Sequence, residues 1–307
     1  MITLTQLRTF LEVAEGESVH QAAARLFVTP PAVSAALASL QREVGSALVS
    51  REGRGVRLTE AGRVFVPYAR RVLGLLDEAV AAAAGQERPE AGRVRVAAVT
   101  TAGEHLLPRY LASFRARYPE AEVRLEVGNR ARVWDVLDNH EVDVAIGGQP
   151  GAEGRFVTLA TRPNTLVVVA APTGGKERAL PLSRNVTVAD LAERVWLLRE
   201  PGSGTRATTE ELFEELGISP RTLTLGSNGA VRASAQVNLG ITLISRDAVA
   251  RELSEGNLEE WRREGLVRRR AWHLVGRAGE NLPSTAALFV GHLVGSATPR
   301  MEAFRLA

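Results

Sequence analysis

The sequence has no cysteine, which excludes disulfide scaffolds, thiolate zinc sites, iron–sulfur clusters and thiol redox switches. It also has no run of about 20 apolar residues, the length that a helix needs to cross a bilayer. The first residues contain no positive cluster, and acidic residues begin at Glu12, which does not fit an export signal. We therefore expect a cytoplasmic protein with no membrane partner.

Lysine is almost absent too, since Lys176 is the only lysine among 38 basic residues. These are opposed by 35 acidic residues, so the net charge is only +3. A basic isoelectric point of 9.9 is therefore no evidence for nucleic-acid binding, which has to be argued from where the arginines stand.

Signatures of catalysis and metal binding are missing as well. The five histidines have no H-x-x-x-H spacing, which would place two imidazoles on one face of a helix. Ser203 stands between glycines, but the nucleophile-elbow pattern G-x-S-x-G is not formed, and neither common phosphate-loop pattern occurs in a strand-to-helix context. We expect no catalytic residue, no metal and no cofactor, and so no enzyme.

The length of 307 residues predicts at least two domains, and residues 1–58 have the pattern of short helices followed by a hairpin. A first helix places Leu7 and Phe10 on one face. Ser18 and Gln21 then have the form of a capping box that begins a second helix.

A third helix begins after Thr29, which can act as its N-cap, with Pro30 in the first turn. Its apolar stripe starts at Val33, which leaves Pro31 and Ser34 facing outward. Small side chains at this place in a helix-turn-helix let the backbone approach base edges in the major groove. The pattern favours DNA binding over the alternative of a helical hairpin with ordinary surface arginines.

Arginines surround two glycines in the next segment, at Arg51, Arg54 and Arg57. This suits a tight hairpin whose tip lies against phosphates. We interpret it as the wing of a winged helix-turn-helix.

A long helix is predicted from Thr59, with apolar residues at alternating spacings of four and three, as in the seam of a coiled coil. They are Ala61, Phe65, Tyr68, Val72, Leu75, Ala79 and Ala82. The seam predicts a homodimer. A polar stretch with proline and glycine ends the helix, so residues 59–92 are interpreted as a dimerising linker helix and hinge.

From Arg93 onward strands alternate with helices, which is typical of a parallel sheet in an α/β domain. Two such runs, over residues 93–163 and 164–267, predict two lobes, and residues 268–307 return the chain to the first. The arginine run at 262–270 is interpreted as a solvated crossover rather than a binding patch.

Polar residues suited to a carboxylate or phosphate stand where strands end and helices begin, the usual place for ligands in open α/β sheets. They are Thr100 and Thr101 after the first strand, Ser203 and Thr205 before a helix of the second lobe, and Ser227 and Asn228 before the next. Each is also an ordinary helix cap, so only their convergence would make a site. Arg206 could add charge by a two-pronged contact, or could be a surface arginine.

Over its whole length the chain resembles a LysR-type transcriptional regulator. The motifs that carry the resemblance are Leu4-Thr-Gln-Leu-Arg-Thr-Phe10, Ala22-Ala23, Val28-Thr29, Pro31-Ala-Val-Ser34, Leu58-Thr-Glu-Ala-Gly62, Tyr118-Pro119, Gly128-Asn129 and Arg199-Glu-Pro-Gly-Ser-Gly-Thr-Arg206. The second half resembles a periplasmic-binding-protein-like effector domain, most like the branch of CysB-like and CbbR-like regulators. Gly229 stands where relatives commonly have Glu, which leaves the cleft less acidic and favours an anionic effector.

The resemblance implies a homodimer through the linker helix, often assembled into a homotetramer, that binds double-stranded promoter DNA and a small-molecule effector. It implies these site residues: Thr29, Pro30, Pro31, Ser34, Arg51 and Arg54 for DNA, and Thr100, Thr101, Asn129, Gln149, Ser203 and Thr205 for the effector. Our hypothesis for the mechanism is that effector binding changes the angle between the lobes and thereby the spacing of the paired DNA-binding units. DNA bending and contact with RNA polymerase would change as a result.

Two other classes stay open at this point. One is a solute-binding or enzyme domain whose N-terminal helices serve only for dimerisation. The other is an architectural DNA-binding protein whose second half is a scaffold without an effector.

Overall fold

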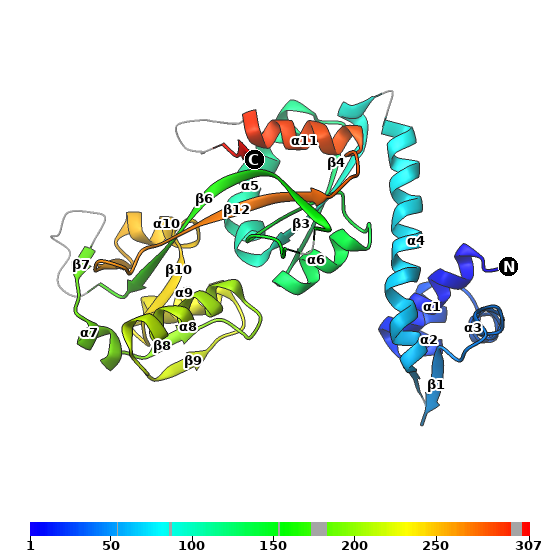
Figure 1. Cartoon of the computed structure of the whole chain (residues 1–307), viewed down its shortest axis with the longest axis horizontal. Helices are drawn as coiled ribbons and strands as arrows, with labels where there is room; N and C mark the ends of the chain where they lie inside the picture. The colour runs from blue at the N-terminus through cyan, green and yellow to red at the C-terminus, as the bar shows by residue number, and fades with distance from the viewer. Residues whose placement is uncertain (54, 86–87, 153, 173–182, 296–302) are drawn as a thin grey trace.

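The computed structural model describes residues 1–307 except 54, 86–87, 153, 173–182 and 296–302. It has a helical domain with a small hairpin at the N-terminus, a long connecting helix, and a two-lobed α/β domain (Figure 1). The multidomain architecture predicted from the sequence is therefore confirmed.

The N-terminal domain packs three helices against a hairpin. Its elements are α1 (Leu4–Gly16), α2 (Val19–Arg25), α3 (Pro30–Val44), β1 (Val49–Glu52) and β2 (Gly55–Leu58). Phe10, Leu40 and Leu48 are fully buried at its centre. The Ser18 side chain accepts from the backbone N–H of Gln21 as expected, at 3.3 Å, but no return bond from the Gln21 side chain occurs within the described part of the chain.

The connecting helix α4 (Glu60–Gly85) is capped by Thr59, whose hydroxyl oxygen accepts from the backbone N–H of Gly62 at 3.0 Å. Only part of the predicted coiled-coil seam is free to contact a second chain. Phe65 packs edge-on against Phe10, with ring centroids 5.5 Å apart, so this turn of the helix belongs to the N-terminal core. Among the predicted seam residues exposure begins at Tyr68, and Val64 one turn before it is exposed as well.

The first lobe contains a parallel sheet, with β3 between β4 and β5. Its elements are η1 (Pro89–Ala91), β3 (Arg93–Val99), η2 (Ala102–Leu106), α5 (Leu107–Arg117), β4 (Glu122–Gly128), α6 (Arg130–Asp138), β5 (Val144–Gly147), α11 (Ser284–Gly295) and β13 (Arg305–Leu306). The aromatic rings of Tyr110, Phe114 and Phe289 fill its core.

The second lobe is built from the middle of the chain. Its elements are β7 (Ser183–Asn185), α7 (Val188–Glu193), β8 (Trp196–Leu198), α8 (Gly204–Leu216), β9 (Thr222–Thr224), α9 (Asn228–Gln236), β10 (Thr242–Ser245), α10 (Arg246–Glu255) and β11 (Glu259–Arg262). Trp196 and Trp261 are buried in it.

Two long strands connect the lobes, β6 (Phe156–Ala170) and β12 (Arg268–Arg277), which pair antiparallel along their length (Figure 1). β12 also pairs with β5 of the first lobe, whereas β6 also pairs with β10 and β11 of the second. The strand expected at Thr165 thus begins at Phe156, and the expected boundary between residues 163 and 164 falls inside it. The polar Arg162-Pro163-Asn164 looks like a break in the sequence, but pairing with β12 carries the strand through it.

Helix α4 also contacts the first lobe. A Cβ atom on Gly74 would lie 2.3 Å from the carbonyl oxygen of Asn139, so only glycine allows this approach. One turn later, the buried Glu78 carboxylate pairs with the Nδ1 atom of His140 at 2.9 Å and with Arg277. The helix that leaves the N-terminal domain is thus fixed to the effector domain by close packing and buried charge.

Candidate functional site

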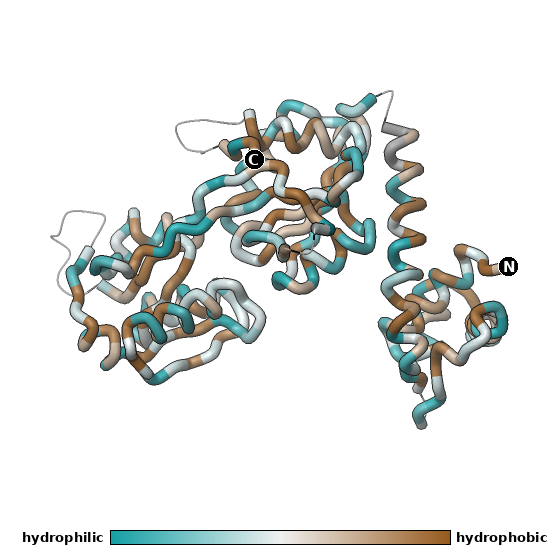
Figure 2. The backbone as a smooth tube through the Cα atoms, viewed as in Figure 1, coloured by the Kyte–Doolittle hydropathy of each residue, from teal (hydrophilic) through white to brown (hydrophobic). Residues whose placement is uncertain are grey.

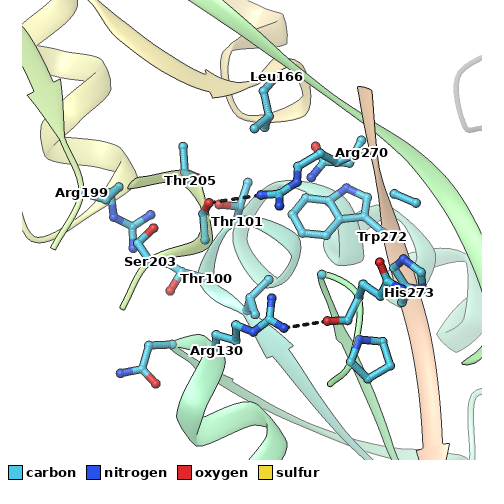
Figure 3. Close-up of a pocket in the computed structure, with 18 of the residues that line it drawn as sticks. Thr100, Thr101, Arg130, Leu166, Arg199, Ser203, Thr205, Arg270, Trp272 and His273 are labelled. Carbon is cyan, nitrogen blue, oxygen red and sulfur yellow. Dashed lines mark hydrogen bonds between the residues drawn. The ribbon is translucent and has the colours of Figure 1, made fainter. Parts of the chain in front are cut away.

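A cavity of about 660 Å³ lies between the lobes, against the crossover strand β12. All six residues expected to bind an effector line it: Thr100, Thr101, Asn129, Gln149, Ser203 and Thr205. They come from four separate parts of the chain, and Figure 3 shows Thr100, Thr101, Ser203 and Thr205 near one another. The convergence that the sequence could not establish is therefore present in the fold.

The second-lobe side of the cavity is the N-terminus of α8. Ser203 is the N-cap residue, but its side chain makes no capping bond, and Thr205 lies in the first turn. The first N–H groups of a helix have no partner within the helix, and the helix dipole favours negative charge there. This side of the cavity offers hydrogen-bond donors.

On the first-lobe side, two predicted residues are held by bonds of their own. Asn129 caps α6, and its side-chain oxygen accepts from the backbone N–H of Arg132 at 2.9 Å. The carbonyl oxygen of Gln149 accepts from Arg130 Nη2 at 2.7 Å. These bonds fix the wall and leave the Asn129 amide hydrogens and the Gln149 side chain for a ligand.

Positive charge is the strongest feature of the cavity and the one that sequence reasoning missed. Arg130, Arg269 and Arg270 line it, and within the described residues none of the three forms an ion pair with a carboxylate. The one acidic residue in the lining, Glu200, is paired with Arg199. The cavity thus holds three arginine charges that no lining carboxylate balances.

Arg269 and Arg270 belong to the arginine run interpreted as a solvated crossover. Arg262 ends β11, whereas Arg268, Arg269 and Arg270 begin the crossover strand β12. The sequence interpretation did not anticipate that the exposed Arg269 and Arg270 line the cavity. The strand is exposed at these two positions and, apart from the half-buried His273, buried from Trp272 onward. A switch from charged to buried residues along one strand is the signal that could have located them.

Two further residues near the cavity add no charge to it. Arg206 is not among the lining residues, and its guanidinium is bound to Glu210 and to the carbonyl oxygen of Arg199. Burial lowers the pKa of His273 below its ordinary value of 6.5, so this lining residue is neutral at pH 7.

The second candidate surface is on the N-terminal domain. Thr29, Pro31 and Ser34 are exposed at the start of α3, and Pro30 is half-buried beside them. Thr29 is the N-cap residue, yet its hydroxyl makes no capping bond. Arg51 is exposed on strand β1 of the hairpin. The sixth expected residue, Arg54, lies outside the described residues.

The buried face of α3 matches the expectation, since Val33, Leu37 and Leu40 pack into the domain core. The exposed face therefore presents small residues at the N-terminal end of the helix. An exposed helix start and a hairpin with exposed residues on the same small domain are the features with which winged helix-turn-helix domains contact DNA.

One cluster could be read as a metal site. Ligand atoms of Glu78, His140 and Glu280 lie within 4.8 Å of one another. Arg277 pairs with both carboxylates of this cluster, so a guanidinium already supplies the positive charge. We interpret the cluster as a structural contact.

No single helix of the described chain is long and apolar enough to cross a membrane. Within the residues that the structure describes, the one helix pair that reaches this length and composition is α2 with α3, and the two are bent by 107°. Buried residues of both helices form the core of the N-terminal domain.

A winged helix-turn-helix, a connecting helix and a two-lobed domain with a cavity between its lobes define the class of ligand-responsive DNA-binding regulators. The LysR substrate binding domain model matches residues 87–298, and the model of the bacterial regulatory helix-turn-helix protein, lysR family, matches residues 4–63. The chain belongs to the LysR family of transcriptional regulators.

Curated relatives agree with this assignment. The transcriptional regulator CbbR of Rhodospirillum rubrum is 34% identical over 96% of each chain. The RuBisCO operon transcriptional regulator of Allochromatium vinosum is 34% identical over 94% of each. These relatives support the CbbR-like part of the expected branch, and they are regulators rather than enzymes.

Solved structures agree on the fold. Full-length CbnR in complex with its target DNA has a TM-score of 0.69 at 23% identity, covering 96% of this chain and all of that one. The regulatory domain of CcmR from Synechocystis, solved in complex with 2-PG, has a TM-score of 0.59 at 27% identity over 68% of this chain and 99% of that one. The chain is thus a DNA-binding transcriptional regulator with an effector-binding domain.

Proposed function

We propose that the effector is a small anionic metabolite held in the cavity between the lobes by Thr100, Thr101, Asn129, Gln149, Ser203 and Thr205 together with the lining arginines. The observation that carries this proposal is the set of three lining arginines, Arg130, Arg269 and Arg270, with no carboxylate partner among the described residues. An anion would supply the missing charge, and arginine forms two-pronged bonds with carboxylates and phosphates. The 2-PG bound to the CcmR regulatory domain, 2-phosphoglycolate, is an anion of this kind.

The test is isothermal titration of the full-length protein with 2-phosphoglycolate, inorganic phosphate and a panel of small carboxylates. Replacing Arg130→Gln or Arg270→Gln should weaken binding of the preferred anion roughly 10-fold to 100-fold, the range for a hydrogen bond to a charged group. Arg206→Gln is the matched control, because this arginine follows the lining residue Thr205 on α8 but is not part of the lining, and its guanidinium is bound to Glu210 and to the carbonyl oxygen of Arg199. Equal affinities for all four proteins would refute the site.

Helix α6 supports a route from the effector to the DNA-binding domain. Its first residue, Arg130, lines the cavity, and the turn that follows its C-terminus, Asn139 and His140, packs against Gly74 and Glu78 of α4. A movement of this nine-residue helix would therefore reach the connecting helix. By linkage, an effector that changes DNA affinity must have its own affinity changed by DNA by the same factor.

The DNA contacts are assigned to Thr29, Pro30, Pro31 and Ser34 in the groove, with Arg51 and Arg54 against phosphates. Replacing Arg51→Gln should weaken binding to promoter DNA at every sequence and reduce the salt dependence by about one counterion. Ser34→Ala should instead reduce the preference for the operator over random DNA. Fluorescence anisotropy at several salt concentrations separates the two, and identical losses for both variants would contradict the assignment.

The proposed assembly is a homodimer through α4, with two dimers forming a homotetramer that contacts RNA polymerase in the cytoplasm. The exposed apolar face of α4 supports the dimer, because Tyr68, Val72 and Leu75 are each about half exposed in one chain. Figure 2 shows hydrophobic residues recurring along this helix. Leu75→Asp should give monomers in sedimentation analysis, and an unchanged mass would contradict this interface.

A further inference from the structure

A chain of polar side chains crosses from the second lobe to the first behind the cavity. Asn228 lies at the start of α9 with only 2% of its surface exposed. Its Nδ2 atom donates to Thr101 Oγ1 of the first lobe at 2.8 Å. Its Oδ1 atom accepts from Arg199 Nη1, and the rest of that guanidinium binds Glu200 at 2.7 and 2.8 Å.

The direction of every bond in this chain is fixed by chemistry. A guanidinium can only donate, so the amide oxygen of Asn228 must face Arg199 and its NH2 group must face Thr101. The Thr101 oxygen is therefore an acceptor in this contact, and its own proton cannot be directed at the NH2 group. Among the described residues no acceptor for that proton is recorded, and Thr101 lines the cavity. The proton is left for a ligand.

The neighbouring Thr100 has the opposite arrangement. Its hydroxyl donates to the carbonyl oxygen of Gly128 at 3.3 Å, so it presents lone pairs to the cavity. Two adjacent threonines, alike in the sequence, thus differ in the group they offer. Thr101 offers a proton to an ionised oxygen, whereas Thr100 offers an acceptor to a hydroxyl or another protonated group of the effector.

We propose that Asn228 is a specificity-determining positioning residue, which fixes Thr101 as a hydrogen-bond donor and so selects an effector with an ionised oxygen at that point. The inference rests on the proposed anionic effector, and it adds the direction of one contact and the residue that sets it. Asn228 does not touch the effector; it acts through Thr101. The same bond ties the lobes together, since Thr101 follows β3 and Asn228 begins α9.

The decisive variant is Asn228→Asp, which keeps the size and shape of the side chain. One carboxylate oxygen still accepts from Arg199, but the other now takes the Thr101 proton, so Thr101 turns an acceptor toward the cavity. We expect 2-phosphoglycolate, or the tightest anion of the panel, to bind about 10-fold to 100-fold more weakly in isothermal titration of the full-length protein. Thermal unfolding of the unliganded variant checks that the chain still folds.

The added negative charge would weaken anion binding by itself, so the experiment is completed as a double-mutant cycle with Thr101→Val. In the Thr101→Val background the hydroxyl is gone, so Asn228→Asp should weaken anion binding only by the smaller factor that the added negative charge causes. A clear difference between the two factors supports the proposal. Equal factors in both backgrounds would overturn it while leaving the effector site intact.

A second comparison does not depend on the folding of the Asn228 variant. Thr101→Val should weaken anion binding much more than Thr100→Val, and Thr101→Ser, which keeps the hydroxyl, should restore most of the loss. Equal losses at the two threonines would refute the assigned directions. If the wild-type protein binds no anion saturably, the proposed function itself fails, and the role of Asn228 fails with it.

Discussion

Two arginine-rich regions of this protein differ in how their charge is balanced. Where α4 meets the first lobe, Arg277 lies between Glu78 and Glu280 and pairs with both. Around the cavity between the lobes, Arg130 and Arg269 have no carboxylate partner among the described residues. Both regions bring distant parts of the chain together, yet only at the contact between α4 and the first lobe is the arginine charge balanced by carboxylates.

The difference has a physical reason. A buried charge without a partner costs several kcal/mol, so a folded interior keeps arginines only where acids accompany them. An open cavity contains water, which solvates an unbalanced guanidinium at little cost until a ligand replaces the water. We therefore interpret the balanced charge as a structural contact and propose that the unbalanced charge of the cavity marks a ligand site.

The largest effect is expected from breaking a balanced pair. Asp143 is 2% exposed, accepts from the backbone N–H of Arg95 at 2.7 Å, and pairs with its guanidinium at 2.7 Å. Asp143→Ala leaves a buried guanidinium alone and should destabilise the protein by about 3–5 kcal/mol. Denaturant unfolding measures this loss. A loss similar to that of an exposed pair, tested with Glu255→Gln, would refute the structural interpretation.

The second largest effect on stability is expected from disturbing the packing between α4 and the first lobe. Gly74→Ala places a methyl group against the Asn139 carbonyl oxygen and should separate α4 from the first lobe, at a cost of roughly 1–3 kcal/mol. Gly291→Ala is the matched control, because it lies in α11 with open space around it and should stabilise the protein by about 0.5–1 kcal/mol. Hydrogen exchange in residues 137–142 should quicken only in the first variant. Equal exchange in both would mean that the contact does not hold the helix.

The two regions also differ in how far the sequence predicts them. Helix caps and apolar periodicity are local, so Thr29, Val33 and the strand after Arg93 were placed from sequence alone. The convergence of Thr101 and Ser203 depends on strand order, which residue patterns do not encode. Arg270 was interpreted as a solvated residue because no local pattern shows which side of a crossover strand faces a cavity.

A smaller effect is expected from pH. Burial lowers the pKa of His273 and of His292 below their ordinary value of 6.5, so the folded state binds these protons less readily than the unfolded state does. Stability should therefore be lost as the pH falls below about 6.5, and the loss should level off below the folded pKa values. Thermal unfolding measured between about pH 5 and 8 gives the slope of stability against pH. His292→Gln should flatten it, and an unchanged slope would assign the pH dependence to other groups.

The smallest effect on stability is expected at the unbalanced site, and it is the most informative. Arg269 is exposed on β12 and has no carboxylate to leave behind, so Arg269→Gln should change the free energy of unfolding by no more than about 0.5 kcal/mol. The same variant should weaken anion binding roughly 10-fold, because a ligand charge loses its partner. For Asp143→Ala we expect the reverse, namely a large loss of stability while the arginines of the cavity stay in place. If Arg269→Gln instead destabilised the unliganded protein as much as Asp143→Ala, its charge would be balanced within the fold, and unbalanced charge could no longer be used to locate the effector.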